Sequence, residues 1–368
     1  MIWIYFFALL IWALVFFWID KGVSASERVG TSDPSDEPES FAILIAVRNE
    51  EELIQFCLAS IEGQEWLPKN TTVYIVDDHS ADETAKVIED FSRTSKLSIQ
   101  VLPLLEGVGK KAAIRHGLSR ISEELLYLCD GDVLLQKGTI INMFRTLQQS
   151  NCSVAFGPVV YEEEGLLTKV LAAENLNTQL VSEAFLNHGN ALMVNGANMM
   201  IQGSMKGRFA ATLESRLASG DDVFFAQSLS QNEYVSGYYR EHAVIARFPK
   251  TSAMFFAQRV RWASKSSNYS KFINRGFAGL IFGLNLVSVS VWLLLPFIDG
   301  HFWLFLFLFG KWLVEFSFHR KWFHKYAFHH SPLSSIILTI CYPLYVSIIG
   351  AASIIGIGFN WKGRTYKM

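Results

Sequence analysis

Apolar residues are concentrated in two kinds of segment along this chain, and each kind predicts a different structure. Between residues 41 and 129 the apolar runs are short, and amphipathic segments separate them. A fully buried parallel strand is nearly continuous in apolar residues, so these runs predict strands at 41–47, 72–76, 98–103 and 125–129. The segments between them predict helices at about 53–61, 82–92 and 107–120, with Asn49 as a helix cap. Strands that alternate with helices predict an α/β fold, in which helices sandwich a mainly parallel sheet.

The long apolar runs near the two ends predict membrane-spanning helices, because about 20 residues cross a bilayer. The run Ile2–Ile19 has no basic residue before it and is rich in tryptophan, so it predicts a retained anchor rather than a cleaved signal peptide. Two runs near the other end are also long enough to span, 277–298 and 333–359. The segment 302–318 is shorter and contains Lys311 and Glu315, so it is either a packed span or a helix lying in the interface. One N-terminal and two to three C-terminal spans are therefore expected.

Basic residues near the C-terminal end leave the number of spans open. The stretch from His319 to His330 is basic and aromatic, and so is the tail with Lys362, Arg364 and Lys367. Positive charge favours the cytoplasmic side. Three spans after the central domain would place the tail outside, whereas two spans would place the stretch 319–330 outside.

These patterns divide the chain into four parts. They are a transmembrane anchor (1–20), a polar, acidic linker with two prolines (21–40), an α/β domain (41–270) and a membrane region (271–368).

Composition narrows the function classes. The 368 residues are 51% hydrophobic and have a mean hydropathy of +0.24, which is too apolar for an ordinary soluble protein. The net charge of −2 gives no overall basic character, so nucleic acid is not an expected partner. The four cysteines form no Cys-x-x-Cys pair, which argues against a zinc site or a disulfide framework.

Polar residues follow three of the predicted strands directly. They are Arg48–Glu50, Asp77–Ser80 and Asp130–Asp132. Because the carboxyl ends of parallel strands meet at one edge of a sheet, these groups should converge on one crevice. Two carboxylates that flank a glycine suit a hard divalent cation which also binds phosphate oxygens. The alternative is an ordinary Asp-Gly turn.

The ordered set of motifs resembles the family-2 glycosyltransferases, which have a GT-A-type nucleotide-sugar domain. The motifs that carry the resemblance are Val47–Glu51, Val76–Asp82, Gly109–Ala113, Asp130–Asp132, Asn195–Asn198, Ser219–Asp222 and Gln258–Trp262. Each is weak alone, but together they appear in the order and at about the spacing of the family, over residues 41–262.

The resemblance implies a donor site for a nucleotide sugar. Asp132 would hold the metal, Mg²⁺ or Mn²⁺, and Asp130 would meet the metal or the ribose. Asp78 would accept from a uracil N–H, and Glu50 would meet the ribose. Lys110 would neutralise phosphate; a solvated lysine at a helix end is an equal alternative. The alternative for the pair Asp77–Asp78 is that one of the two caps the next helix.

The resemblance also implies an acceptor site. The last acid of the pair Asp221–Asp222 would be the general base that an acceptor hydroxyl needs, although Ser219 followed by acids also resembles a helix cap. A base and a leaving-group metal on opposite faces of the sugar imply inversion.

The motif Gln258–Trp262 adds a second set of acceptor-side residues. On a helix, Gln258, Arg261 and Trp262 share nearly one face. Trp262 would stack on an acceptor sugar or close a lipid cleft, and Arg261 would meet the diphosphate. The alternative is an interfacial helix whose arginines extend to the headgroups.

Together these features predict a multi-pass, metal-dependent hexosyltransferase of the cell membrane with a cytoplasmic catalytic domain. It would move a sugar from a nucleotide sugar, most simply a UDP-sugar, to a membrane lipid, a lipid-linked glycan or a growing glycan. A processive polysaccharide synthase, a catalytically silent nucleotide-sugar-binding scaffold and a small transporter are the rivals.

Overall fold

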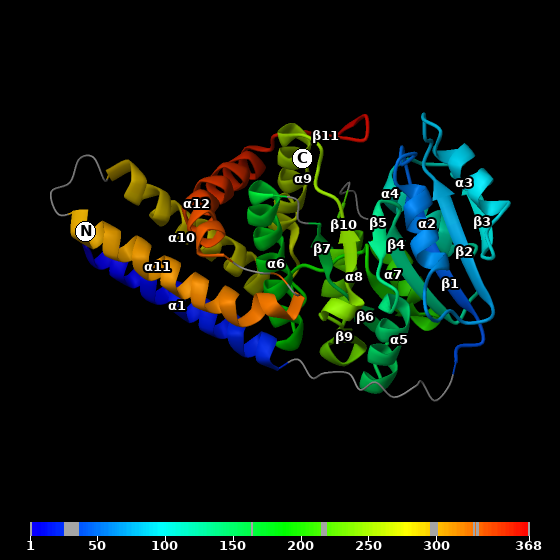
Figure 1. Cartoon of the computed structure of the whole chain (residues 1–368), viewed down its shortest axis with the longest axis horizontal. Helices are drawn as coiled ribbons and strands as arrows, with labels where there is room; N and C mark the ends of the chain where they lie inside the picture. Colours follow the sequence, from blue (N-terminus) through cyan, green and yellow to red (C-terminus); the bar gives the residue numbers. More distant parts are fainter. Residues whose placement is uncertain are drawn as a thin grey trace. The chain divides into compact units, whose positions relative to one another are not determined.

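The computed structural model describes residues 2–25, 37–162, 165–214, 219–294, 301–326, 328 and 331–366 (Figure 1). Most of the predicted linker, Lys367 and the end of the predicted span 277–298 lie outside these residues. The chain forms two compact units. The sheet unit comprises Ser26–Glu162 and Gly189–Arg247, and the helical unit comprises Met1–Ala25, Glu163–His188 and Phe248–Met368.

The sheet unit contains a central sheet of seven described strands in the order β3-β2-β1-β4-β8-β6-β9. Their bounds are β1 Phe41–Val47, β2 Thr71–Asp77, β3 Ser98–Pro103, β4 Leu125–Asp130, β6 Val154–Phe156, β8 Met199–Gln202 and β9 Tyr234–Ser236. Strands β3, β2, β1 and β4 are parallel, β8 is antiparallel to both of its neighbours, and β9 is parallel to β6. This mixed, mainly parallel sheet confirms the predicted fold class. A small sheet pairs β5 Val133–Leu135, β10 Val244–Ala246 and β7 Val159–Tyr161.

Successive side chains of β1 point to opposite faces of the sheet, and helices cover both faces. Ile43 and Ile45 belong to a core cluster with Ile54 and Leu58 of α2, whereas Leu44 lies against Gly117 of α4. The helices of this unit are α2 Ile54–Glu62, α3 Thr84–Ser92, α4 Lys110–Leu118, α5 Thr139–Ser150, α7 Lys206–Thr212 and α8 Asp221–Ser228, with short 3₁₀ helices at Gly203–Met205, Gln231–Glu233 and Arg240–His242.

The register brings the polar strand ends to one level. Ala46 of β1 pairs with Val76 of β2 and with Asp130 of β4. Asp77, one residue after Val76, and Asp130 therefore end their strands at nearly the same height, as the strand-end argument predicts.

The prediction that Asn49 caps the next helix is wrong. The structure places the start of α2 at Ile54, and Asn49 has a φ of 50°, in the left-handed region. Its side-chain Oδ1 accepts from the backbone N–H of Ala81 instead, at 2.9 Å. Asparagine tolerates this conformation better than most residues, so its presence after a strand was compatible with a loop as well as with a cap.

The helical unit contains the long apolar helices. Its elements are α1 Ile2–Ser24, α6 Leu166–Asn187, α9 Ser252–Ala263, α10 Phe272–Leu294, α11 His301–Trp322 and α12 Pro332–Ile355, with 3₁₀ turns at Ser266–Asn268 and Phe323–Tyr326 and a hairpin of β11 Phe359–Trp361 and β12 Arg364–Tyr366. Two helices from the predicted 41–270 domain, α6 and α9, belong to this unit. Within the described residues, four helices are long and apolar enough to cross a membrane: Trp3–Ser24, Phe272–Leu294, Phe302–Tyr326 and Pro332–Ile355. The segment 302–318 is thus part of a long helix.

Candidate functional site

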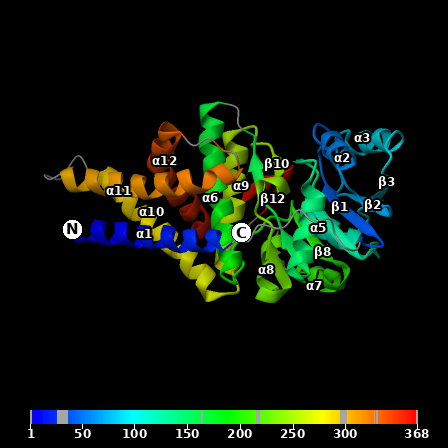
Figure 2. The same ribbon diagram turned by 60° about the horizontal axis from the view of Figure 1, so that its bottom comes forward.

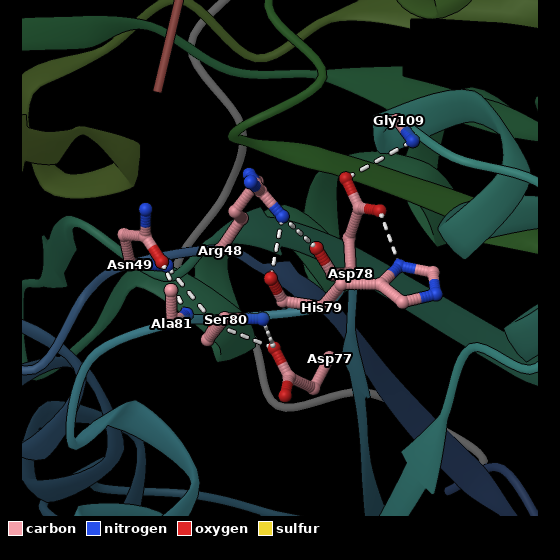
Figure 3. A network of polar contacts seen from close by, with 8 residues as sticks. All are labelled: Arg48, Asn49, Asp77, Asp78, His79, Ser80, Ala81 and Gly109. Carbon is pink, nitrogen blue, oxygen red and sulfur yellow. Dashed lines mark hydrogen bonds and ion pairs between the residues drawn. The ribbon is translucent and has the colours of Figure 1, made fainter. Parts of the chain in front are cut away.

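The loop after β2 separates the roles of its two acids (Figure 3). Asp77 Oδ1 accepts from the backbone N–H and from Oγ of Ser80, so this acid closes its own turn. Asp78 is buried and points the other way, where its Oδ2 accepts from the backbone N–H of Gly109 at 3.0 Å. Its Oδ1 lies 3.2 Å from Nδ1 of His79. The side chain proposed to bind a base is therefore directed toward the start of α4.

The loops after β1 and β2 are held to each other. Arg48 Nη1 donates to the carbonyl oxygens of Asp78 and His79, at 2.7 and 2.5 Å. The backbone N–H of Asn49 donates to Ser80 Oγ at 3.0 Å. Glu50 is buried, and its N–H donates to Thr84 Oγ1 at 2.7 Å. Arg48 and Asn49 thus fix the backbone that carries Asp78, a supporting role that the sequence motif did not reveal.

Lys110 lies among carboxylates. Its Nζ is 2.6 Å from Asp130 Oδ1 and 3.7 Å from Asp221 Oδ2. Burial alone would lower the pKa of Lys110, but the carboxylates of Asp130, Asp221 and Asp222 outweigh it and raise that pKa well above its ordinary value. The ammonium is therefore a permanent charge held by acids from two distant motifs, and the alternative of a solvated lysine at the helix end is wrong.

Asp222 is fixed by two backbone N–H groups. Gly196 donates to its Oδ2 at 3.0 Å, and Val223 donates to its Oδ1 at 2.7 Å. A Cβ atom on Gly196 would lie 3.2 Å from the Asp222 Cβ, so the glycine permits the close approach. The turn that contains Gly196 is anchored by the buried Asn198, whose side chain accepts from Tyr127 Oη and donates to the carbonyl oxygens of Pro158 and His242. The Asn195–Asn198 motif thus supports the Asp222 carboxylate.

These contacts bring the acidic motifs together within the sheet unit. Asp78 binds the N–H of Gly109, and the next residue, Lys110, binds Asp130 and Asp221. The acids after β2, after β4 and at the start of α8 therefore meet at the beginning of α4.

The glycine between Asp130 and Asp132 is required by packing. A Cβ on Gly131 would lie 2.8 Å from Val47 Cγ1 and 3.4 Å from Ile54 Cδ1. A Cβ on Gly207 would cause no such steric clash, because no atom lies within 4 Å of its position. The Asp-Gly-Asp spacing thus follows from the close contact of the β4 end with β1 and α2.

We expect Gly131→Ala to lower the free energy of unfolding by about 1–3 kcal/mol, the usual cost of overpacking, and to lower the activity that depends on the flanking acids, because both acids shift. Thermal unfolding and the rate of that activity measure the two effects. Gly207→Ala is the matched control and should leave both quantities close to those of the unchanged protein. Equal effects of the two substitutions would contradict the packing argument.

The donor set around Asp130 and Asp132 fits a hard divalent cation that is shared with a diphosphate. Carboxylate oxygens are the ligands such cations prefer, and Mg²⁺ is usually held by one or two carboxylates plus substrate phosphates. Among the residues that the structure describes, no three His, Cys, Asp or Glu side chains are arranged as ligands of one ion. The ammonium of Lys110 lies on Asp130, and the assignment of the metal to Asp132 stays a prediction of the resemblance.

The Gln258–Trp262 motif lies on α9, in the helical unit. Thr251 Oγ1 caps this helix by accepting from the N–H of Met254 at 3.2 Å. Gln258, Arg261 and Trp262 are partly buried. Arg259, between the motif residues, is buried and donates to Glu174 of α6 at 2.6 Å. Arg259 therefore does not extend to headgroups, and sequence reasoning missed Glu174, which has no motif around it.

Comparisons with known proteins show which family the first part of the sheet-forming region is similar to. Residues 42–214 match the model of glycosyl transferase family 2. An N-acetylglucosaminyltransferase of Neorhizobium galegae is 25% identical over 161 residues, which cover 43% of this chain and 37% of that protein. A poly-beta-1,6-N-acetyl-D-glucosamine synthase of Staphylococcus epidermidis is 25% identical over 138 residues, which cover 37% of this chain and 32% of that one. The chain thus spans about a third of the length of these two relatives.

A solved structure shares the fold over nearly the whole length. It is the mannosyltransferase PcManGT from Pyrobaculum calidifontis in complex with GDP-Man and Mn²⁺, with a TM-score of 0.59 and 16% identity, over 95% of this chain and 93% of that one. Through residues 42–214, the chain is therefore similar to glycosyl transferase family 2, and it has the mainly parallel, GT-A-like α/β fold that its sequence predicts.

Proposed function

We propose that this chain is a membrane-bound, inverting glycosyltransferase. It moves a sugar from a nucleotide sugar, a UDP-sugar in the first instance, to a membrane lipid, a lipid-linked glycan or a growing glycan. The observation that carries the proposal is the meeting of Asp78, Lys110, Asp130 and the Asp221–Asp222 pair at the start of α4. A structural sheet domain needs no such concentration of opposite charges.

The donor is bound by groups at this edge of the sheet. Asp78 accepts from the base and Glu50 meets the ribose. Lys110 lies toward the diphosphate, where its permanent charge stabilises the negative charge that develops on the leaving group. A divalent cation on Asp132 would supply Lewis-acid stabilisation of the same oxygens.

Asp222 acts on the acceptor. Its carboxylate, held by the N–H groups of Gly196 and Val223, takes the proton of the acceptor hydroxyl as the new bond from oxygen to the anomeric carbon forms. The bond from that carbon to the diphosphate breaks on the opposite side, and its electron pair leaves with the phosphate oxygen. One displacement of this kind inverts the anomeric configuration.

The names of the relatives support N-acetylglucosamine as the first sugar to test, and that of the S. epidermidis synthase supports a growing glycan as one acceptor. The purified full chain should be incubated with UDP-GlcNAc, UDP-Glc, UDP-GalNAc or GDP-Man, with Mg²⁺ or Mn²⁺ and a membrane lipid extract. We expect one donor to release its nucleotide and to give a product of inverted configuration by NMR. Product length separates single transfer from a processive synthase. Release from no donor would overturn the proposal.

The packing inside the helical unit supports a membrane topology that satisfies both basic segments. Helices α1 and α11 lie side by side and run in the same direction (Figures 1 and 2), since Tyr5 contacts Phe307 and Asp20 contacts Lys321. Helix α10 runs the opposite way along α1, because Tyr5 hydrogen-bonds Ser290 and Trp18 contacts Phe277. If α1, α10 and α11 each cross the membrane once, in alternating directions, the C-terminal end of α1 and the basic C-terminal end of α11 lie on the same side of the membrane.

Helix α12 crosses this bundle steeply in both views (Figures 1 and 2). It touches Glu315 of α11 through Thr339 and Phe282 of α10 through Gly350. Glu315 and Phe282 lie at a similar depth in the bundle, because the contacts of α11 and α10 with α1 place both residues beside the middle of α1. Thr339 and Gly350 are about 16 Å apart along a helix, which supports an α12 that lies across the bundle and adds no crossing. Its end packs on α9, as β11 does.

We therefore propose three crossings, with the sheet unit, the basic end of α11 and the basic tail all on the cytoplasmic side, in agreement with the positive-inside rule. Single cysteines in sealed vesicles of known orientation test this topology. Lys362→Cys should react with an impermeant maleimide only from the cytoplasmic face, and Leu294→Cys, at the far end of α10, only from the opposite face. Labelling of both from the same face would contradict the arrangement, since α12 would then be a fourth crossing.

A further inference from the structure

Helix α6 carries two buried glutamates nine residues apart, and each is paired with a cation of another element in the helical unit. Glu174 pairs with Arg259 of α9, and Glu183 pairs with Lys325 after α11. The exposed fractions of the two glutamates are 7% and 0%. The first pair contacts the Gln258–Trp262 motif, whereas the second lies at the other end of α6, about 13 Å away along the helix.

The Arg259 guanidinium lies between a carboxylate and two aromatic rings. Its Nη2 is 2.6 Å from Glu174 Oε2, and its central carbon is 4.8 Å from the ring centre of Phe255 and 4.4 Å from that of Trp262. Arg259 is 3% exposed, whereas Trp262 is only partly buried. Burial raises the pKa of Glu174, and the Arg259 guanidinium opposes that shift.

Stability alone does not account for this arrangement. A buried ion pair is often no better than apolar residues of the same volume, because both charges lose their hydration. Apolar side chains would pack α9 on α6 equally well. What the pair adds is a planar cation, fixed by hydrogen bonding and stacked on an indole.

We propose that the Glu174–Arg259 pair is a positioning device that fixes the Trp262 ring for the acceptor. The inference rests on the proposed function, in which Trp262 meets the acceptor sugar or lipid. Arg259 covers one face of the indole, one helical turn before it, and Glu174 prevents the guanidinium from moving. A ring fixed before binding costs less entropy when the acceptor stacks on it.

Glu174→Gln tests this role, and Glu183→Gln is its matched control, since both substitutions remove a buried charge from the same helix. We expect Glu174→Gln to raise the KM for the acceptor about 10-fold, roughly the value of one such stacking contact, with the KM for the donor unchanged. Glu183→Gln should lower the melting temperature and leave the acceptor KM unchanged. If both variants change the acceptor KM equally, or if Glu174→Gln changes only the melting temperature, the pair is structural and the inference fails.

A second readout does not depend on activity. In protein labelled with 5-fluorotryptophan, the ¹⁹F signal of Trp262 is assigned by its loss in Trp262→Phe. We expect this signal to shift or broaden in Glu174→Gln and in Arg259→Lys, which keeps the charge but loses the planar stack, and to stay unchanged in Glu183→Gln. A signal that is insensitive to Arg259→Lys would overturn the positioning role. If the ¹⁹F signal changes in these two variants but the protein transfers a sugar from no donor, the proposed function fails, whereas the conclusion that the pair fixes the Trp262 ring is kept.

Discussion

We expect Asp222→Asn to lower the rate of sugar transfer by about 10²–10⁴-fold, the contribution of a general base, and to leave nucleotide binding unchanged. The amide cannot take a proton from the acceptor hydroxyl, but it keeps the shape of the carboxylate and an oxygen for the N–H of Gly196. Since the amide can keep only one of the two charge-assisted hydrogen bonds from backbone N–H groups, the stability should fall by about 1.5–3 kcal/mol. Nucleotide release at saturating donor and acceptor measures the rate, and calorimetric titration with UDP measures binding.

Asp90→Asn is the control for this substitution. Asp90 is an exposed carboxylate of α3, and the same chemical change there should alter neither quantity. A turnover in Asp222→Asn close to that of the unchanged protein would remove Asp222 from the role of base. A loss of UDP binding in parallel with turnover would instead indicate that the residue supports the site structurally.

The parallel half of the sheet could be predicted because buried strands appear in the sequence as continuous apolar runs. The strands at 41–47 and 98–103 have the predicted bounds. Strand β2 is one residue longer than predicted at each end, and β4 is one residue longer at its C-terminal end. The antiparallel half was not predicted, because β6, β8 and β9 have only three or four residues each. Such strands are too short for a pattern to appear.

Helix α6 escaped prediction for a different reason. Its buried residues include Glu174, Asn175, Gln179 and Glu183. These charged and amide side chains lie among the buried apolar residues of the helix, so its apolar stripe is less distinct in the sequence. The partners that satisfy them, such as Arg259 and Lys325, lie 85 and 142 residues away, so no local pattern could indicate the pairs.

The candidate site, like the fold, was predicted only in part. The strand-end rule correctly placed Asp78 and Asp130 near one another, because it depends only on the direction of parallel strands. The ion pair of Lys110 with Asp221 was not predicted, since it joins the start of α4 to a helix more than 100 residues later. The relation of the Gln258–Trp262 motif to these acids stays a prediction.

Asp132→Asn should lower transfer by about 10³-fold, which corresponds to several kcal/mol of stabilisation lost from the departing diphosphate. An amide has no charge with which to hold a cation, so the stimulation of activity by added Mg²⁺ or Mn²⁺ should also disappear. Asp130→Asn is the informative comparison, because Asp130 is engaged by Lys110 and its loss should leave the metal stimulation in place. Activity as a function of metal concentration, and UDP affinity with and without Mn²⁺, separate the two acids. An unchanged metal dependence in Asp132→Asn, together with its loss in Asp130→Asn, would assign the metal to the first acid of the pair.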